Sequence, residues 1–237
     1  VEIVTAGSVG INQVLKITAL GALSRLPKAL TDGVLNKDFD GDQIWEVLQD
    51  LLLNNWGEVP AALQWTDYDP TETWANAQNT GLGEIDQPGN YELAARTSDR
   101  TDVYSLVIAL ANSGLGYIYE DAQGLISYAD STHRTTYLAI NGYVNLSAND
   151  AQGSGLTIQQ RAGDVRNTIT LKYGTNSTSE VGATDATSVG LYGQLAQIFT
   201  TTVKHQVDAQ DQADFYLTLR AYPQYNLNQI TYQLTNP

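Results

Sequence analysis

The apolar residues of this chain change their spacing several times along the sequence, and the order of those changes limits the fold more than any other feature. In some stretches they alternate every second residue, as in half-buried strands, and in others they recur at helical spacing. The helical stretches are 42–55, 102–113 and 209–221. The order is strands, then helices with a hairpin, then strands, a helix and a closing strand. This order predicts an α+β fold with mainly antiparallel strands, rather than a doubly wound parallel sheet.

The regions between the helices divide into strands, turns and loops. The strand-like stretches are 1–4, 14–18, 165–173, 195–204 and 230–234. The apolar–aromatic runs at 117–119 and 125–128 flank a turn that ends in Gly124, which predicts a hairpin. Residues 57–98 are rich in Gly and Pro and are expected to be ordered but irregular. Residues 174–187 are rich in Gly, Thr, Ser and Asn and are predicted to form a flexible loop.

Polar residues before each helical stretch give candidate caps. Asp40 or Asp42 precedes the first helix and Thr101 the second, and Asp208 with Asp211 resembles an acidic capping box for the third. Gly114 is expected to end the second helix.

The best candidate for a domain boundary is the Gly- and Ser-containing stretch 150–155. It divides the chain into a short β-region at 1–31, an α/β subdomain at 32–155 with helices and the hairpin, and a β-rich domain at 156–237 with one helix. The two short strands of the first region cannot close a sheet by themselves, so they are expected to pair with strands from elsewhere.

The charge and composition exclude several classes of function. The net charge is −14, from 12 basic and 26 acidic residues, and no cluster of Lys and Arg is available to bind nucleic acid or an anionic membrane. There is no Cys, which excludes disulfides and thiolate metal sites, and only His133 and His205 offer imidazoles. No apolar run approaches the length of a membrane span, and no signal peptide is evident.

The low proportion of charged residues suggests a protein whose surface is covered by partners. Charged residues are 16% of the chain and tyrosines number 14, and protein interfaces are depleted in charge and enriched in Tyr. The alternative explanation is a β-rich fold, since Tyr and Thr also favour strands.

One stretch resembles a calcium-binding loop. Its ligand candidates are Asn36, Asp38, Asp40 and Asp42, with Gly41 at the position of the sharp turn. The position that requires a bidentate Glu is Val47, however, and Glu46 lies one place early. Acidic residues also suit the N-terminus of a helix, so we assign no metal site here.

The tryptophans and a group of nearby acids are the candidates for glycan chemistry. Exposed Trp side chains could stack on sugars, although core packing is the more common use of such large rings. Two carboxylates that flank a sugar would suffice for a glycan hydrolase, yet nothing in the sequence selects a pair. The residues concerned are Trp45, Trp56, Trp65, Trp74, Asp67, Asp69, Glu72, Glu84 and Asp86.

Other catalytic patterns are incomplete. Ser154 between two glycines lacks the strand-to-helix context of a nucleophile elbow, and Gly81-Leu82-Gly83 lacks the lysine of a phosphate-binding loop. We therefore assign no catalytic residue and no cofactor, and predict that the chain is not an enzyme. Seven scattered arginines are expected to form some ion pairs at subunit contacts. They are Arg25, Arg96, Arg100, Arg134, Arg161, Arg166 and Arg220.

In order along the chain, several segments together resemble the hub family of minor tail proteins from long-tailed siphophages, especially those of actinobacterial hosts. The segments are Leu15–Leu26, Asp40–Ile44, Gly116–Tyr128, Asp164–Tyr173 and Ser188–Gly193. The resemblance implies a pair of tube-type β-barrels with an inserted α/β subdomain, in a trimer that joins the six-fold tail tube to three-fold tip structures.

That resemblance also implies the partners and the location. The partners would be two further copies of the chain, a distal tail or tail-tube protein above, tip or fibre proteins below, and the tape-measure protein. The location would be the distal end of the virion tail. The family's first barrel has strands upstream of the position matching Val1, and position 1 is not Met, so we expect this chain to be processed or part of a longer protein. The alternative function is a carbohydrate-binding adhesin module or a glycan hydrolase of the tail tip.

Overall fold

The computed structural model describes residues 2–6, 14–18, 21–50, 82–121, 124–143, 145, 157–160 and 162–229. The chain forms two compact units. Unit 1 comprises residues 1–90 and 95–131, and unit 2 comprises residues 91–94 and 132–237. The predicted boundary at 150–155 lies outside the described residues and stays a prediction.

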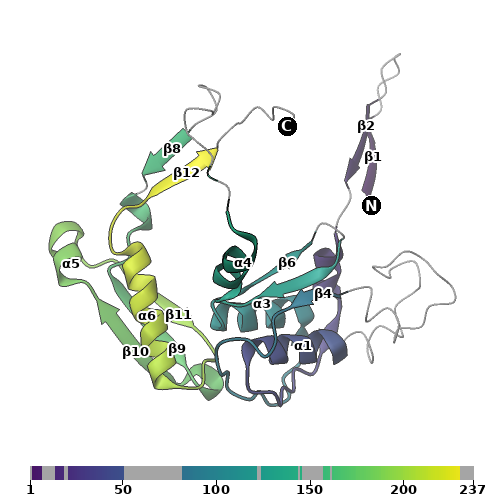
Figure 1. The fold of residues 1–237 in the computed structure, drawn as a ribbon, viewed down its shortest axis with the longest axis horizontal. Coiled ribbons are helices and arrows are strands. Elements are labelled where there is room, and N and C mark those ends of the chain that lie inside the picture. Colours follow the sequence, from purple (N-terminus) through teal and green to yellow (C-terminus); the bar gives the residue numbers. More distant parts are fainter. Residues whose placement is uncertain are drawn as a thin grey trace. The chain divides into compact units, whose positions relative to one another are not determined.

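In its described residues, unit 1 combines helices with short sheets (Figure 1). Strands β1 (Glu2–Ala6) and β2 (Val14–Thr18) pair antiparallel with each other, and β3 (Leu30–Thr31) pairs antiparallel with β5 (Thr101–Asp102). A three-stranded sheet has the order β4-β7-β6, in which β4 runs parallel and β6 antiparallel to β7. Its strands are β4 (Leu82–Ile85), β6 (Tyr117–Glu120) and β7 (Ile126–Ala129).

The helices of unit 1 supply most of its core. They are α1 (Asp40–Asp50) and α3 (Val103–Ser113), which pack against each other, and a 3-10 helix, η1 (Ala22–Lys28), packs against α3. The apolar positions at helical spacing are the buried ones, as the periodicity predicts. The buried set includes Ile44, Val47, Leu48, Val103, Leu106, Val107 and Leu110.

The beginning of α3 differs from the sequence prediction. The cap is Asp102 rather than Thr101, because the Asp102 carboxylate accepts a hydrogen bond from the backbone N–H of Ser105 at 2.8 Å. Gly114 ends the helix, as predicted. The hairpin prediction is also confirmed, since β6 and β7 pair antiparallel and Gly124 adopts a φ of 81° in the turn between them.

Unit 2 contains a three-stranded sheet in the order β10-β9-β11 (Figure 1). Strand β9 (Thr168–Tyr173) is central, β10 (Ser179–Thr184) runs antiparallel to it and β11 (Ala196–Thr200) runs parallel to it. Helix α6 (Gln206–Arg220) packs on β9 and β10. Ile169 and Leu171 are buried while their polar neighbours are half-buried, so the predicted alternation of this strand is confirmed.

The remaining elements of unit 2 are short. Strands β8 (Thr157–Gln160) and β12 (Tyr225–Gln229) pair antiparallel with each other. Helix α4 (His133–Asn141), which the sequence analysis does not predict, buries none of its residues, and α5 (Ala186–Tyr192) leads into β11. The described part of unit 2 also contains the short 3-10 helices η6 (Ala162–Asp164) and η7 (Thr175–Ser177).

Two sequence predictions for unit 2 are wrong. Residues 174–187 are not a flexible loop, because they contain η7, β10 and the beginning of α5, and pairing with β9 orders a segment whose composition alone indicates a loop. The third helix begins at Gln206 with His205 as its cap residue, so Asp208 lies in its first turn and does not cap it.

The α+β class is confirmed, whereas the barrel expectation differs from the observed sheets. The sheets in the described ranges have two or three strands, and none of them closes into a barrel. So few strands cannot meet around an axis, which explains why these sheets stay open.

Candidate functional site

The most constrained polar contact in unit 1 joins Asp40 to Tyr128. Asp40 is the first residue of α1 and Tyr128 lies in β7, and both side chains are fully buried. The Tyr128 hydroxyl donates a hydrogen bond to Oδ2 of Asp40. A buried carboxylate needs such a donor, because removing its hydration is costly. This contact therefore fixes the beginning of α1 to the central strand of the β4-β7-β6 sheet.

Three glycines allow close packing around the beginning of α1, and two of them make room for the Asp40 side chain. A Cβ atom on Gly114, at the end of α3, or on Gly89 would overlap the Asp40 carboxylate. A Cβ atom on Gly41 would overlap the backbone carbonyl oxygen of Asp86. Gly89 also has a φ of +96°, which disfavours other residues. The close approach of α1, α3 and the turn at Gly89 thus depends on the lack of side chains at these positions.

The surroundings keep Tyr128 neutral. Burial raises the pKa of Tyr128 far above its usual value, and the neighbouring negative charge of Asp40 raises it further. The phenol therefore remains a hydrogen-bond donor at any physiological pH. Its role here is to hold the carboxylate in place.

The structure gives the acids of the calcium-like loop other contacts. The Asp40 carboxylate points into the core toward Tyr128. Oε2 of Glu46 accepts hydrogen bonds from the backbone N–H groups of Asn36 and Lys37, at 3.0 and 3.2 Å. Asp42 accepts one from the Gln87 side chain at 3.4 Å. These contacts stabilise the approach to α1 and use carboxylates that a calcium ion would require as ligands.

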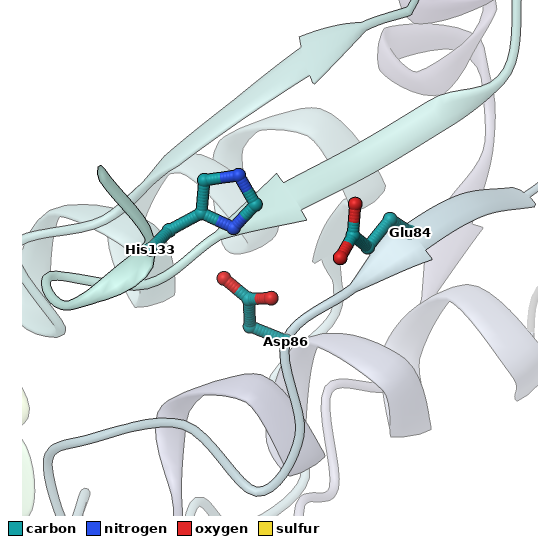
Figure 2. Close-up of side chains that lie close together, drawn as sticks. All are labelled: Glu84, Asp86 and His133. Carbon is teal, nitrogen blue, oxygen red and sulfur yellow. The ribbon is translucent and has the colours of Figure 1, made fainter. Parts of the chain in front are cut away.

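The candidates for glycan chemistry lie only partly within the described residues. Trp45 is half-buried on α1. Glu84 lies in β4 and is exposed, and Asp86 lies just after β4 (Figure 2). The Asp86 carboxylate accepts a hydrogen bond from the backbone N–H of Asp130 at 3.0 Å. The candidates outside the described residues are Trp56, Trp65, Trp74, Asp67, Asp69, Glu72, Gly81 and the stretch 153–155.

Figure 2 also draws His133, which belongs to unit 2 and begins α4. Within unit 1, Glu84 and Asp86 are therefore two carboxylates without an imidazole from the same unit. Two such carboxylates do not by themselves make a metal site, since acidic residues near a surface are commonly solvated.

The corresponding polar network in unit 2 centres on Asn167, which is fully buried. Its Oδ1 accepts from the backbone N–H of Leu195 at 2.8 Å, and its Nδ2 donates to the backbone carbonyl of Gly193 at 2.7 Å. The same Nδ2 lies 3.3 Å from the Ser188 hydroxyl, which in turn donates to the carbonyl of Ala221. One amide thus links the approach to β9 with α5, the approach to β11 and the end of α6.

Asp185 extends this network as the N-cap of α5. Its Oδ1 accepts from the backbone N–H of Ser188 at 2.8 Å and from the Tyr222 hydroxyl at 3.3 Å. Desolvation and the neighbouring Asp185 raise the pKa of Tyr222. The sequence analysis does not single out Asn167, Ser188 or Asp185, although an Asp three residues before a Ser is a recognisable capping signal here, as it is for Asp102 and Ser105.

Three of the described arginines make contacts within the chain. Arg96 forms an ion pair with Asp99 at 3.1 Å, Arg166 donates to the backbone carbonyls of Gly163 and Val165, and Arg220 donates to Gln197. The predicted ion pairs at subunit contacts stay a prediction. Within the described ranges, no helix is long and apolar enough to span a membrane.

The surfaces of the two units differ in character. Unit 1 has 18 acidic and 6 basic residues, a net charge of −12, whereas unit 2 has 8 and 6, a net charge of −2. Most exposed large apolar and aromatic side chains of the described residues lie in unit 2. They are Tyr137, Ile140, Tyr143, Leu191, Tyr192, Ile198, Val207, Phe215, Leu219, Tyr222 and Tyr225.

Comparison with known proteins gives likenesses in structure only. No protein-family model matches the sequence, and no curated protein matches it. Among solved structures, the chain is similar to the prophage tail protein gp18 from Listeria monocytogenes, with 13% identity and a TM-score of 0.44 over 85% of this chain and 54% of that one. It is also similar to the tail protein from Neisseria meningitidis, with 10% identity and a TM-score of 0.45 over 82% and 51%. The chain spans about half the length of these two proteins.

Proposed function

We propose that this chain is a structural protein of a long-tailed bacteriophage tail, and that it forms a trimeric hub at the distal end. The hub would join the six-fold tail tube to three-fold tip structures. The proposal rests on the ordered resemblance of its segments to hub-type minor tail proteins. The low proportion of charged residues is consistent with a surface covered by other subunits.

The observation that carries the proposal is where the resembling segments lie in the fold. Asp40–Ile44 and Gly116–Tyr128 meet through the buried contact between Asp40 and Tyr128. Asp164–Tyr173 and Ser188–Gly193 meet through the side chain of Asn167. Segments that are far apart in the sequence thus supply the interior polar contacts of each unit, as expected if the resemblance reflects a shared architecture.

The polar groups in these contacts have structural roles, which supports a non-enzymatic function. Asp40 holds a tyrosine, Asn167 holds backbone groups of neighbouring segments, and Glu46 holds the approach to α1. The proposed partners are two further copies, a distal tail or tail-tube protein, tip or fibre proteins and the tape-measure protein. A net charge of −14 would repel the phosphates of DNA as it passes.

Electron microscopy of virions with an antibody to this chain tests the location and the symmetry together. We expect label at the distal end of the tail and three copies around the tail axis. Label on the capsid, or a six-fold ring of this chain, would contradict the hub proposal.

A second candidate is an adhesin module that binds host glycans. Its support is the group of exposed tyrosines in unit 2, where Tyr192, Tyr222 and Tyr225 are exposed and Tyr222 donates to the Asp185 carboxylate. Aromatic faces beside a carboxylate can stack on and bind a sugar. A glycan array incubated with the purified chain tests it, and binding that is lost in Tyr222→Ala and retained in Tyr117→Ala would favour this candidate. Glycan cleavage that is lost in Glu84→Gln or in Asp86→Asn would instead favour a hydrolase.

A further inference from the structure

The two edges of the β10-β9-β11 sheet are built differently, and the β10 edge is protected. The backbone N–H of Asp185, just after β10, donates to the carbonyl of Asn167. The backbone N–H and C=O groups of the odd-numbered residues of β10 therefore point toward β9, and those of the even-numbered residues point outward. The outward carbonyl of Gly182 accepts a hydrogen bond from the Gln210 side chain at 3.2 Å, and Glu180 adds a charge. Such devices keep an edge strand from pairing with another chain.

The β11 edge, on the other side of β9, is built without these devices in the described part of the chain. The backbone N–H of Thr201 donates to Lys172 and the carbonyl of Leu195 accepts from Asn167, so the odd-numbered residues bond to β9. The N–H and C=O groups of Ala196, Ile198 and Thr200 therefore face outward. The strand contains no charged residue and no proline, and within the described part of the chain no other strand pairs with it.

The chain itself covers the continuation of this edge. The backbone N–H of Ala94 donates to the carbonyl of Thr202 at 2.6 Å, and that of Lys204 donates to the carbonyl of Glu92 at 2.9 Å. Leu93 and Val203 form an antiparallel bridge. The same edge thus already accepts a strand at residues 202–204, and the uncovered part is β11.

β11 carries one large apolar side chain on each face of the sheet. Phe199 stacks on Tyr216 of α6, with ring centroids 4.1 Å apart. Ile198 lies on the opposite face and is 63% exposed. A strand added beside β11 would cover part of Ile198 and extend the apolar contact on the helix side. The combination is typical of an edge that pairs with another chain.

The charge distribution indicates what the added strand belongs to. Two copies that met through unit 1 would bring net charges of −12 together, whereas through unit 2 each contributes only −2. A positively charged partner would be attracted to the acidic unit 1. A second copy of this acidic chain would meet the least electrostatic repulsion at unit 2. We propose that a strand from a second copy of this chain pairs with the outer edge of β11. This inference rests on the proposed function, in which the chain forms a homo-oligomer.

The test measures mass and amide protection on the whole chain. Light scattering after size-exclusion chromatography gives the mass over a range of protein concentrations, and hydrogen exchange reports the amides of Ala196, Ile198 and Thr200. We expect these amides to become protected as the chain assembles. We expect Ile198→Lys and Thr200→Pro to raise the concentration needed for assembly by about tenfold or more, since they remove several contacts and hydrogen bonds.

Thr200→Pro keeps the test valid if the lysine variant does not fold. The N–H that this substitution removes points away from β9, so the hydrogen bonds between β9 and β11 are retained. Ser179→Lys, at an exposed position of the protected β10 edge, is the matched control and should assemble like the unchanged chain.

The outcomes separate this inference from the proposed hub. A trimer in which both β11 variants assemble normally, or in which the three amides stay unprotected, would overturn the inference and leave the hub proposal standing. A dimer with protected β11 amides would support the inference and contradict the trimer. A chain that stays monomeric at every concentration would overturn it.

Discussion

Units 1 and 2 have a polar contact at the centre of each, but the two contacts are built on different chemistry. In unit 1, a buried carboxylate meets a buried phenol in a space left by glycines. In unit 2, the amide of Asn167 is shared among a hydroxyl and two backbone groups. The first arrangement depends on close spacing around one carboxylate, whereas the second shares one amide among several partners. Unit 1 should therefore tolerate substitution less well than unit 2.

The surfaces of the two units also differ, in net charge and in exposed apolar side chains. Unit 1 is strongly acidic, whereas unit 2 is almost neutral and carries most of the large apolar side chains that are exposed among the described residues. Acidic surfaces favour solubility, while neutral surfaces with aromatic side chains favour association. The difference indicates that the more constrained interior belongs to the unit whose surface repels copies of itself.

The largest effect is expected for Gly41→Ala in unit 1. The added Cβ would overlap the Asp86 carbonyl oxygen, which is backbone and cannot rotate away. We expect a loss of about 3 kcal/mol in the free energy of unfolding of unit 1, the upper part of the range for overpacking. Urea titration followed by hydrogen exchange measures this for each unit separately.

Gly190→Ala in α5 is the control in unit 2. A Cβ there meets no atom within 4 Å, so the substitution should be neutral or should stabilise the helix by up to about 1 kcal/mol. Equal losses in the two variants would contradict the proposed difference between the units.

Tyr128→Phe should have the next largest effect. It removes the hydroxyl that donates to Asp40 while it keeps the ring, so the loss comes from a buried carboxylate with one donor fewer. We expect about 1.5–3 kcal/mol, the range for a hydrogen bond to a charged group. Tyr117→Phe, at an exposed position, should change the free energy of unfolding by less than about 0.5 kcal/mol.

The sequence predicts the elements of unit 1 better than the contact that fixes them. Periodicity identifies α1 and α3 because each of them buries one regular face, and the turn at Gly124 between two apolar runs identifies the hairpin. The sequence also draws attention to Asp40, but as a candidate helix cap and as part of a calcium-like loop. The partner of Asp40 lies 88 residues away, and no local pattern indicates that a tyrosine in β7 would meet the beginning of α1.

Unit 2 shows a different limit of sequence reasoning. The composition of 174–187 indicates a loop, yet Val181 and Ala183 are buried in β10 once β9 pairs with it. Strand formation in such a segment is decided by tertiary contacts rather than by local preference. Asn167 could not be predicted as a network centre for the same reason, since its side-chain partners come from α5, from Gly193 just after α5 and from the approach to β11.

Asn167→Asp tests the network of unit 2 with almost no change in shape. The Asp side chain lacks the N–H donors of the amide, so the carbonyl of Gly193 and the Ser188 hydroxyl each lose a hydrogen-bond donor. We expect a loss of about 1–3 kcal/mol, confined to unit 2. Thermal unfolding together with hydrogen exchange of each unit measures it, and Asn145→Asp at an exposed position is the control. A loss shared equally by unit 1 would show that the two units unfold as one.

The smallest effect should be the pH dependence that Glu92 adds to unit 2. Residues 91–94 belong to unit 2 although both flanking stretches belong to unit 1, and the Glu92 carboxylate contacts Lys204 at 3.1 Å and His205 at 2.9 Å. These hydrogen bonds lower the pKa of Glu92 from its ordinary value of 4.5. The stabilising contribution is therefore fully present above pH 4.5 and is lost as the pH falls through the lower pKa of the folded state. In Glu92→Gln this dependence should disappear, so the difference in melting temperature between the variant and the unchanged chain should shrink as the pH falls below 4.5. Glu84→Gln in unit 1 controls for the loss of one charge, and an identical pH profile for the two variants would mean that the contacts of Glu92 do not tie residues 91–94 to unit 2.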